Sequence, residues 1–247
     1  MGISALLSIG VLIALFFIFR KRFGIKLVPV LVGAAAFVLF VMVLEAYVHN
    51  LILKPDAEGN IALRSQPILF MLYGGFMAGL FEETARFLCF HIMKRKYRGI
   101  GTALGYGIGH GGIEAILLAG VTMIANLILC VQINAGTPPA GIPEASVLAL
   151  MAVPPSQFLI GGIERVLVLG IQIPLSVLVY YSVMAKGKWW LFPLAILLHA
   201  VVDFLPALYQ TGVVTNLYAV EGVVALYSIG MIYLAVRTHR AYRGLEA

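Results

Sequence analysis

The segment GLFEETAR, residues Gly79–Arg86, is the stretch from which the class of this protein follows. It places Glu82, Glu83 and Arg86 in the middle of the apolar run Pro67–Met93. A run of this length can cross a bilayer, and a charged side chain at the centre of a bilayer costs at least about 2.5 kcal/mol. Helix formation requires none of these charges. They therefore predict buried pairing, a water-filled cavity or chemistry inside a membrane.

The composition agrees with a membrane location for the whole chain. Hydrophobic residues make up 62% of the sequence, charged residues 11%, and the mean hydropathy is +1.00. Soluble domains carry about 25% charged residues. The chain is therefore predicted to be an all-α integral membrane protein, a polytopic helical bundle in a cell membrane, with the prokaryotic plasma membrane as the expected location.

Apolar segments of about 20 residues predict seven transmembrane helices. The segments are Ile3–Phe19, Leu27–Tyr47, Pro67–Met93, Ile100–Ile133, Gln157–Met184, Trp189–Leu208 and Val213–Val236. They make residues 1–247 a single transmembrane domain. Within it, residues 1–66 form two N-terminal helices, 67–208 carry the motifs, and 209–247 form the last helix and a basic tail.

The loop between the fourth and fifth segments is expected to be irregular and external. Residues 134–156 contain five prolines, which cannot continue a helix or a strand without a break: Pro138, Pro139, Pro143, Pro154 and Pro155.

Lysine and arginine alternate between the two sides of the predicted bundle. The turns after the first, third and fifth segments and the tail hold most of them: Arg20, Lys21, Arg22, Lys26, Lys94, Arg95, Lys96, Arg98, Lys186, Lys188, Arg237, Arg240 and Arg243. The intervening turns hold only Lys54 and Arg64. Since positive charge favours the cytoplasmic side, the N-terminus is predicted outside and the C-terminus in the cytoplasm. The basic runs are topology signals, and no nucleic-acid partner is expected.

Two groups of charges lie inside the predicted spans. Glu82 and Glu83 precede Arg86 by four and three residues, so both can reach it on one helix. Glu164 and Arg165 are adjacent and diverge by about 100° around the helix axis. Arg165 is therefore expected to pair with a group on another helix.

Two further pairs have the spacing of side chains that share one helical face. His110 and Glu114 are four residues apart in the fourth segment, and His199 and Asp203 are four apart in the sixth. This i, i+4 spacing suits joint metal ligation or an acid–base relay.

Counting along the helices brings these residues to one level of the bilayer. At 1.5 Å per residue from the cytoplasmic ends, Glu83, His110 and His199 each lie roughly 15 Å deep, near the midplane. The other acidic candidates lie within about one turn of this level: Glu114, Asp203 and Glu164. Three helices are thus predicted to bring one Glu and two His to a common site.

The motifs resemble those of the YhfC family of intramembrane peptidases. The resemblance rests on Glu82-Glu83-x-x-Arg86, Gly109-His110-x-x-x-Glu114 and His199-x-x-x-Asp203, in this order on separate spans. With Gly161–Arg165 it covers most of residues 74–205. It also indicates kinship with CAAX-processing, bacteriocin-processing and PrsW-type membrane proteases. It implies peptide hydrolysis within the membrane.

The chain departs from the CAAX-type pattern in two places. Arg86 comes one residue earlier, closer to the PrsW-type spacing, and the last motif ends in Asp203, which lacks the amide of asparagine. The resemblance leaves open which glutamate is catalytic and whether a metal takes part.

The residue types suit amide hydrolysis, which needs a base for water and a group for the oxyanion. Glu82 or Glu83 would be the base, with Arg86 holding the other glutamate ionised. His110 would share the water, and His199, oriented by Asp203, would stabilise the oxyanion. Depth favours Glu83 as the glutamate facing both histidines, and the family resemblance favours Glu82. The other would pair with Arg86 or Arg165.

The same residues allow a metal-dependent version. His110, His199 and Glu83 would then hold zinc, since two histidines, a carboxylate and an open position form a catalytic zinc site. The soluble metalloprotease signature His-Glu-x-x-His is absent. The glutamate version requires no cofactor. Glu114, Glu164 and Arg165 would have supporting roles in either version.

A transporter is the alternative class. Gly111–Glu114 recurs as Gly161–Glu164, and in the predicted topology these helices run in opposite directions. Inverted repeats with buried carboxylates are typical of secondary transporters, here a proton-coupled one. A catalytically inactive membrane scaffold is the third class. For a peptidase, the expected partners are the bilayer and a membrane-embedded or lipidated peptide, and the oligomeric state stays open.

Overall fold

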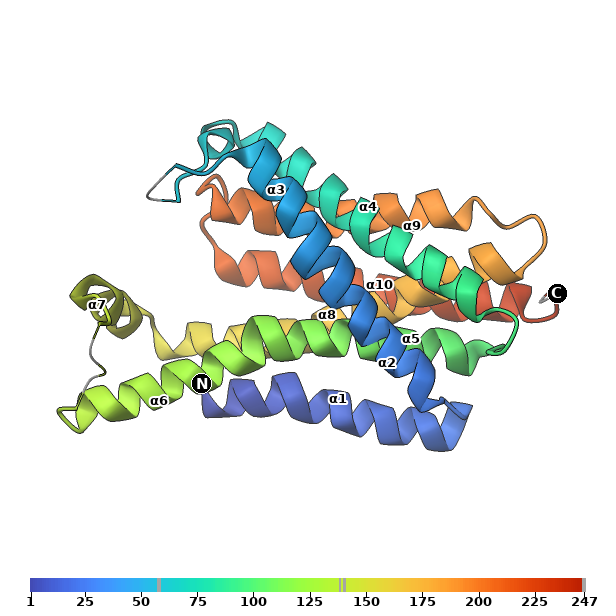
Figure 1. The fold of residues 1–247 in the computed structure, drawn as a ribbon, viewed down its shortest axis with the longest axis horizontal. Coiled ribbons are helices and arrows are strands. Elements are labelled where there is room, and N and C mark those ends of the chain that lie inside the picture. Colours follow the sequence, from blue (N-terminus) through green and yellow to red (C-terminus); the bar gives the residue numbers. More distant parts are fainter. Residues whose placement is uncertain (57–58, 138, 140, 246–247) are drawn as a thin grey trace.

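A computed structural model describes residues 1–56, 59–137, 139 and 141–245. These residues form helices and connecting loops, without a strand among them (Figure 1). The helices are α1 (Gly2–Phe23), α2 (Leu27–Phe37), η1 (Val38–Glu45), α3 (Ala46–Leu53), η2 (Ala62–Ser65), α4 (Pro67–Met93), α5 (Ile100–Ala115), η3 (Ile116–Gly120), α6 (Val121–Asn134), α7 (Glu144–Ala152), α8 (Pro155–Met184), α9 (Leu191–Gln210) and α10 (Leu217–Tyr242).

Several of these elements join into long rods. The π-helical segment η1 connects α2 to α3, and the π-helical segment η3 connects α5 to α6, so each rod is continuous (Figure 1). π-Helical turns are rare, and those inside α-helices are frequently found at functional sites. Here η3 begins two residues after Glu114.

The prediction of an all-helical membrane protein is confirmed. Six helical rods in the described part of the chain are long and apolar enough to cross a membrane: Gly2–Phe23, Leu27–Leu53, Ile100–Asn134, Pro155–Met184, Leu191–Gln210 and Leu217–Tyr242. α4 is as long as a span, at 27 residues, and it carries Glu82, Glu83 and Arg86. It is not one of the six, so the seventh span stays a prediction.

α8 lies at the centre of the bundle. Its second half, from Leu169 to Met184, is almost entirely buried. It packs against α5 on one side and α10 on another, while α4 runs along α9 and α2 crosses α5 (Figure 1). This arrangement brings α4, α5, α8 and α9 around one interior.

The basic turns gather at one end of the bundle. The α1–α2 turn, the α4–α5 turn, the α8–α9 turn and the C-terminus all lie at that end in Figure 1. The Lys26 ammonium lies 5.7 Å from the centre of the Tyr97 ring, and that of Lys188 lies 4.7 Å from the centre of the Tyr242 ring. The one-sided charge is therefore a property of the fold, and its assignment to the cytoplasm stays a prediction.

The loop expected between residues 134 and 156 is more regular than predicted. It contains α7, a helix of nine residues that begins directly after Pro143. Proline is tolerated at such a helix start because its missing N–H has no partner there anyway. Of the five prolines, Pro138 lies outside the described residues.

Candidate active site

α4 brings its three charges into the interior of the bundle. Glu83 and Arg86 have no exposed surface, and Glu82 is 6% exposed. Such charges are stable only when they are paired and hydrogen-bonded. The surrounding helices supply those partners.

Glu83 joins α4 to α9. Its Oε1 lies 2.6 Å from Arg86 Nη1 and 2.6 Å from His199 Nδ1, so it accepts from both. α4 and α9 approach closely at Gly79, where a Cβ would lie 2.6 Å from the carbonyl oxygen of Ile196. Because a carboxylate only accepts, Nδ1 of His199 carries a proton and its Nε2 is directed away from Glu83.

Glu82 lies between the two histidines. Its Oε2 accepts a hydrogen bond of 2.8 Å from His110 Nε2, and its Oε1 lies 3.7 Å from His199 Nε2. The depth estimated from the helical rise per residue favoured Glu83 as the glutamate that faces both imidazoles, whereas the structure has Glu82 in that position. Glu83 has the expected second role, pairing with Arg86.

Gln172 of α8 was not predicted from the sequence, and it links the site together. Its Oε1 accepts a hydrogen bond from Arg86 Nη2, and its Nε2 donates to Glu82 Oε2 at 3.1 Å and to Glu114 Oε2 at 2.8 Å. The orientation of the amide follows, because arginine can only donate and carboxylates only accept. A signal for it existed, since Gln172 lies two helical turns after Arg165 on the same face of α8.

Glu114, Glu164 and Arg165 form a separate, outer cluster. Arg165 donates from Nη1 to Glu114 Oε1 at 3.2 Å, which is the expected partner on another helix. It also donates from Nη2 to its neighbour Glu164. The expectation that Glu164 and Arg165 diverge was therefore wrong: both long side chains bend towards each other. The cluster reaches the inner network through Gln172.

Asp203 is farther from His199 than predicted. Its Oδ2 lies 3.6 Å from His199 Nε2, beyond hydrogen-bond distance, and its side chain is 39% exposed. Glu83 rather than Asp203 thus fixes the orientation of His199.

A cavity of about 290 Å³ connects the inner site with the outer cluster. Its lining mixes polar and apolar side chains from α4, α5, η3, α8, α9 and α10. The polar ones are Glu82, Glu114, Glu164, Arg165, Gln172, His199, Asp203 and Gln210. His110 and Glu83 lie behind this wall, fully buried. The site is therefore an interior polar cavity, with Glu82 and His199 at its inner surface.

Comparison with known proteins identifies the family. Residues 3–224 match the model of a family described as YhfC intramembrane metalloprotease, so the chain belongs to this family. It is 33% identical over 251 residues to the protein named "Uncharacterized membrane protein YhfC" of Bacillus subtilis (strain 168), covering 98% of this chain and 95% of that protein. No solved structure matches. The kinship with CAAX-processing and PrsW-type proteases stays a prediction from the motifs.

The family description implies a metal, and the donor atoms fit zinc in their chemistry. Two imidazole Nε2 atoms face one carboxylate, Glu82, at 2.8 and 3.7 Å. Ligands about 2.1 Å from a tetrahedral zinc lie about 3.4 Å apart. His199 also has the Nδ1–carboxylate bond that usually orients a zinc-bound histidine. In the described residues, however, no group of three or more His, Cys, Asp or Glu is arranged to hold a metal ion.

The geometry bears on which carboxylate would bind such a metal. Glu83 is bonded to Nδ1 of His199, on the opposite side of the ring from Nε2. The residue that faces Nε2 of both histidines is Glu82. Glu82 is thus the carboxylate near Nε2 of both histidines, whereas Glu83 is bonded to Nδ1 of His199, and the predicted zinc ligands His110, His199 and Glu83 stay a prediction.

Proposed function

We propose that this chain is an intramembrane endopeptidase that hydrolyses peptide bonds of membrane-embedded or lipidated peptides. One observation carries the proposal: the Glu82 carboxylate lies between two imidazoles at the wall of a polar cavity inside a helical membrane protein. Water, a base and an oxyanion partner can meet there. The family description as an intramembrane metalloprotease supports the same reaction class.

Glu82 is the base in this proposal. Its Oε2 is occupied by His110 and Gln172, while its Oε1 faces the gap of 3.7 Å to His199 Nε2. A water molecule can bridge polar groups at that separation. Glu82 would take a proton from this water as the oxygen adds to the peptide carbonyl.

His199 is the oxyanion partner. With Nδ1–H held by Glu83, a protonated ring directs its Nε2–H towards the cavity, where the negative charge develops. Glu82 then returns its proton to the amide nitrogen as the C–N bond breaks. The products are a carboxylic acid, which then loses its proton to water, and an amine, and both glutamates end as they began.

Zinc chemistry uses the same residues. His110, His199 and Glu82 would hold the ion, which when bound supplies Lewis-acid polarisation of the carbonyl and a more acidic water. The role of Arg86 and Glu83 is the same in both versions: they fix the position of His199 and balance charge.

The experiment uses the full chain in proteoliposomes with a library of single-span peptides and a mass-spectrometric readout. The wild-type protein is expected to cut at defined bonds, and a folded His199→Ala variant is not. Absence of cleavage of every peptide by a folded wild-type protein would overturn the proposal.

A chelator titration on the same proteoliposomes separates the two chemistries. Stoichiometric zinc that is lost together with activity would establish the metal version. Full activity after removal of all metal would establish the glutamate version.

A proton-coupled transporter is the second candidate, and one observation favours it. The two sequence repeats, Gly111–Glu114 and Gly161–Glu164, each end in a glutamate, and both glutamates accept a hydrogen bond from Arg165. Their second glycines, Gly112 and Gly162, both pack against α1. Solute accumulation driven by a pH gradient in the same proteoliposomes, without proteolysis, would select this function.

A further inference from the structure

The active-site cavity extends from the site towards one end of the bundle. Along α9 its lining begins at His199 and continues to Gln210, where that helix ends. Along α8 it begins at Gln172 and continues to Glu164, towards the start of that helix. The end of α9 and the start of α8 both lie away from the basic turns (Figure 1). The cavity therefore leads to the end of the bundle that holds Gln210, which we call the Gln210 end.

The lining of this cavity becomes more exposed in the same direction. Glu82 and His199, at the inner end, are buried. Asp203 lies one turn further along α9 and its side chain is partly exposed, and Gln210 is exposed. The helix rises about 16 Å from His199 to Gln210, close to half the thickness of a bilayer core of about 30 Å. The cavity is thus a passage that joins the Gln210 end to the site.

Three aromatic rings fill the interior on the other side of the site. Phe90 of α4, Tyr106 of α5 and Tyr180 of α8 are all buried. The centre of the Phe90 ring lies 4.9 Å from that of Tyr106 and 5.6 Å from that of Tyr180, which is contact distance for aromatic rings. Tyr106 lies one turn nearer to the basic turns than His110, and the two rings stack with their centres 5.8 Å apart. This packed layer separates the site from the basic turns.

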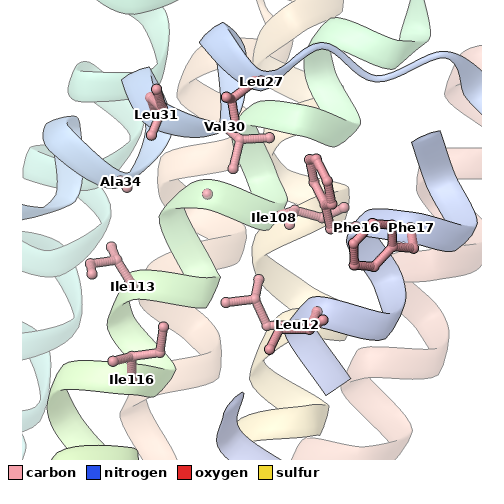
Figure 2. Close-up of a pocket in the computed structure, with 12 residues that line it drawn as sticks. Leu12, Phe16, Phe17, Leu27, Val30, Leu31, Ala34, Ile108, Ile113 and Ile116 are labelled. Atoms are coloured by element: carbon pink, nitrogen blue, oxygen red, sulfur yellow. The ribbon is translucent and has the colours of Figure 1, made fainter. Parts of the chain in front are cut away.

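Two other cavities have linings that are separate from that of the passage. A polar one of about 210 Å³ lies between the α1–α2 and α4–α5 turns and ends at Thr102, one turn short of the buried Tyr106. An apolar one of about 320 Å³ lies between α1, α2 and α5, with Leu12, Ile108 and Ile113 in its lining (Figure 2). Its lining residues are apolar, and apolar cavities stay dry. Among the described residues, neither cavity shares a lining residue with the passage, so neither supplies the site with water.

We propose that water and the peptide both reach Glu82 from the Gln210 end. The substrate class is then a membrane-anchored peptide whose scissile bond lies in the half of the bilayer on that side. With the basic turns in the cytoplasm, as the sequence predicts, this is the non-cytoplasmic half. The statement about the peptide rests on the proposed function, whereas the statement about water does not.

The first test measures from which side of a sealed membrane the passage can be reached, and it needs no peptidase activity. The full chain first loses its own thiols by Cys89→Ala and Cys130→Ala. Single cysteines are then introduced by Asp203→Cys, Gln210→Cys or Lys186→Cys, and a membrane-impermeant maleimide is added to right-side-out and to inside-out membrane vesicles. Asp203→Cys is expected to be labelled from the same side as Gln210→Cys and from the opposite side to Lys186→Cys.

The matched control is Ser176→Cys, a change of similar size at a buried position of α8, one turn from Gln172 towards the basic turns. It is expected to stay unlabelled from both sides. Val202→Cys lines the passage beside Asp203 and repeats the measurement without removal of a charge. Labelling of both passage cysteines from the Lys186 side, or from neither side, would overturn the proposal, and so would labelling of Ser176→Cys from the Lys186 side.

The second test locates the bonds that are cut. A single-span peptide is fused at one end to a soluble protein, so that its orientation in the cell membrane is known, and the fragments are identified by mass spectrometry. Every cut is expected in the half of the span on the Gln210 side, and cuts in the other half would overturn the proposal. Labelling as expected without cleavage of any peptide would support the passage and overturn the proposed function instead, so the two failures are distinguishable.

Discussion

Two clusters of the same composition, each two glutamates and one arginine, line one interior and differ in their surroundings. In the inner cluster Arg86 is fully buried between Glu82 and Glu83, with a histidine bonded to each glutamate. In the outer cluster Arg165 is 13% exposed and Glu164 is 34% exposed, and no histidine is bonded to either glutamate in the described residues.

This difference in burial and in histidine partners separates side chains suited to catalysing hydrolysis from side chains suited to controlling how a substrate enters the cavity. Arg86 and Glu83 have no exposed surface, so a charge there that loses its partner has no water to replace it, and these two positions are fixed. The outer side chains can rehydrate through the cavity and move. We therefore expect the inner cluster to act on the bond and the outer cluster to shape entry to it.

Removal of the inner arginine should have the largest effect on stability. Arg86→Met leaves two buried carboxylates without their cation, and it should destabilise the fold by about 3–5 kcal/mol. The matched change Arg165→Met should cost less, about 1–3 kcal/mol, because Glu164 is 34% exposed and water can replace the arginine there. Thermal unfolding in detergent measures both. Equal losses would remove the distinction between the clusters.

Glu83→Gln should reduce activity while the fold is retained. The change weakens the bond that orients His199, and loss of such an orienting carboxylate typically costs about 10–100-fold. Glu164→Gln in the outer cluster is the control and should cost less than about fivefold. Initial rates of peptide cleavage give the comparison. A larger loss for Glu164→Gln would place the working residues in the outer cluster.

Gln172→Leu should destabilise the fold by about 1–3 kcal/mol, because it leaves buried donors and acceptors of both clusters unsatisfied. Gln210 lines the same cavity but is exposed, so Gln210→Leu should stay within about 0.5 kcal/mol. Unfolding of the two variants under identical conditions is the measurement. Equal destabilisation by Gln172→Leu and Gln210→Leu would contradict the role of Gln172 as a bridge between the two clusters.

Asp203→Asn should have the smallest effect, a loss of activity below about fivefold. Asp203 is 3.6 Å from His199 and 39% exposed, so it contributes little to the orientation of the ring. Cleavage rates of Asp203→Asn and Glu83→Gln, measured side by side, decide which carboxylate orients His199. A greater loss for Asp203→Asn would restore the role that the motif predicted.

The sequence predicts the long helices and the convergence of the charged residues well. Hydropathy and basic turns define the helices, and a fixed rise per residue brings Glu83, His110 and His199 to one level. The structure brings these three side chains into one bonded network with Glu82. Their catalytic roles stay predictions.

What the sequence cannot give is the rotation of each helix about its axis. Glu82 and Glu83 point about 100° apart, and the packing of Gly75 and Gly79 against α9 decides which of them meets His110. Gln172 was missed for a different reason: an uncharged polar residue costs less to bury than a charged one, so it stands out less in an apolar run. The α7 helix was not predicted because the prolines around it were read as helix breakers, whereas proline can also stand at the start of a helix.

The most direct test of the central claim compares wild-type protein with Glu82→Gln in one bilayer, on one peptide that the wild type cleaves. Glutamine keeps the shape and can still bond to His110, but it cannot take a proton from water. We predict a loss of about 10³-fold in the cleavage rate with an unchanged unfolding temperature, since a general base contributes about 10²–10⁴-fold. Cleavage by Glu82→Gln at the wild-type rate would contradict the account.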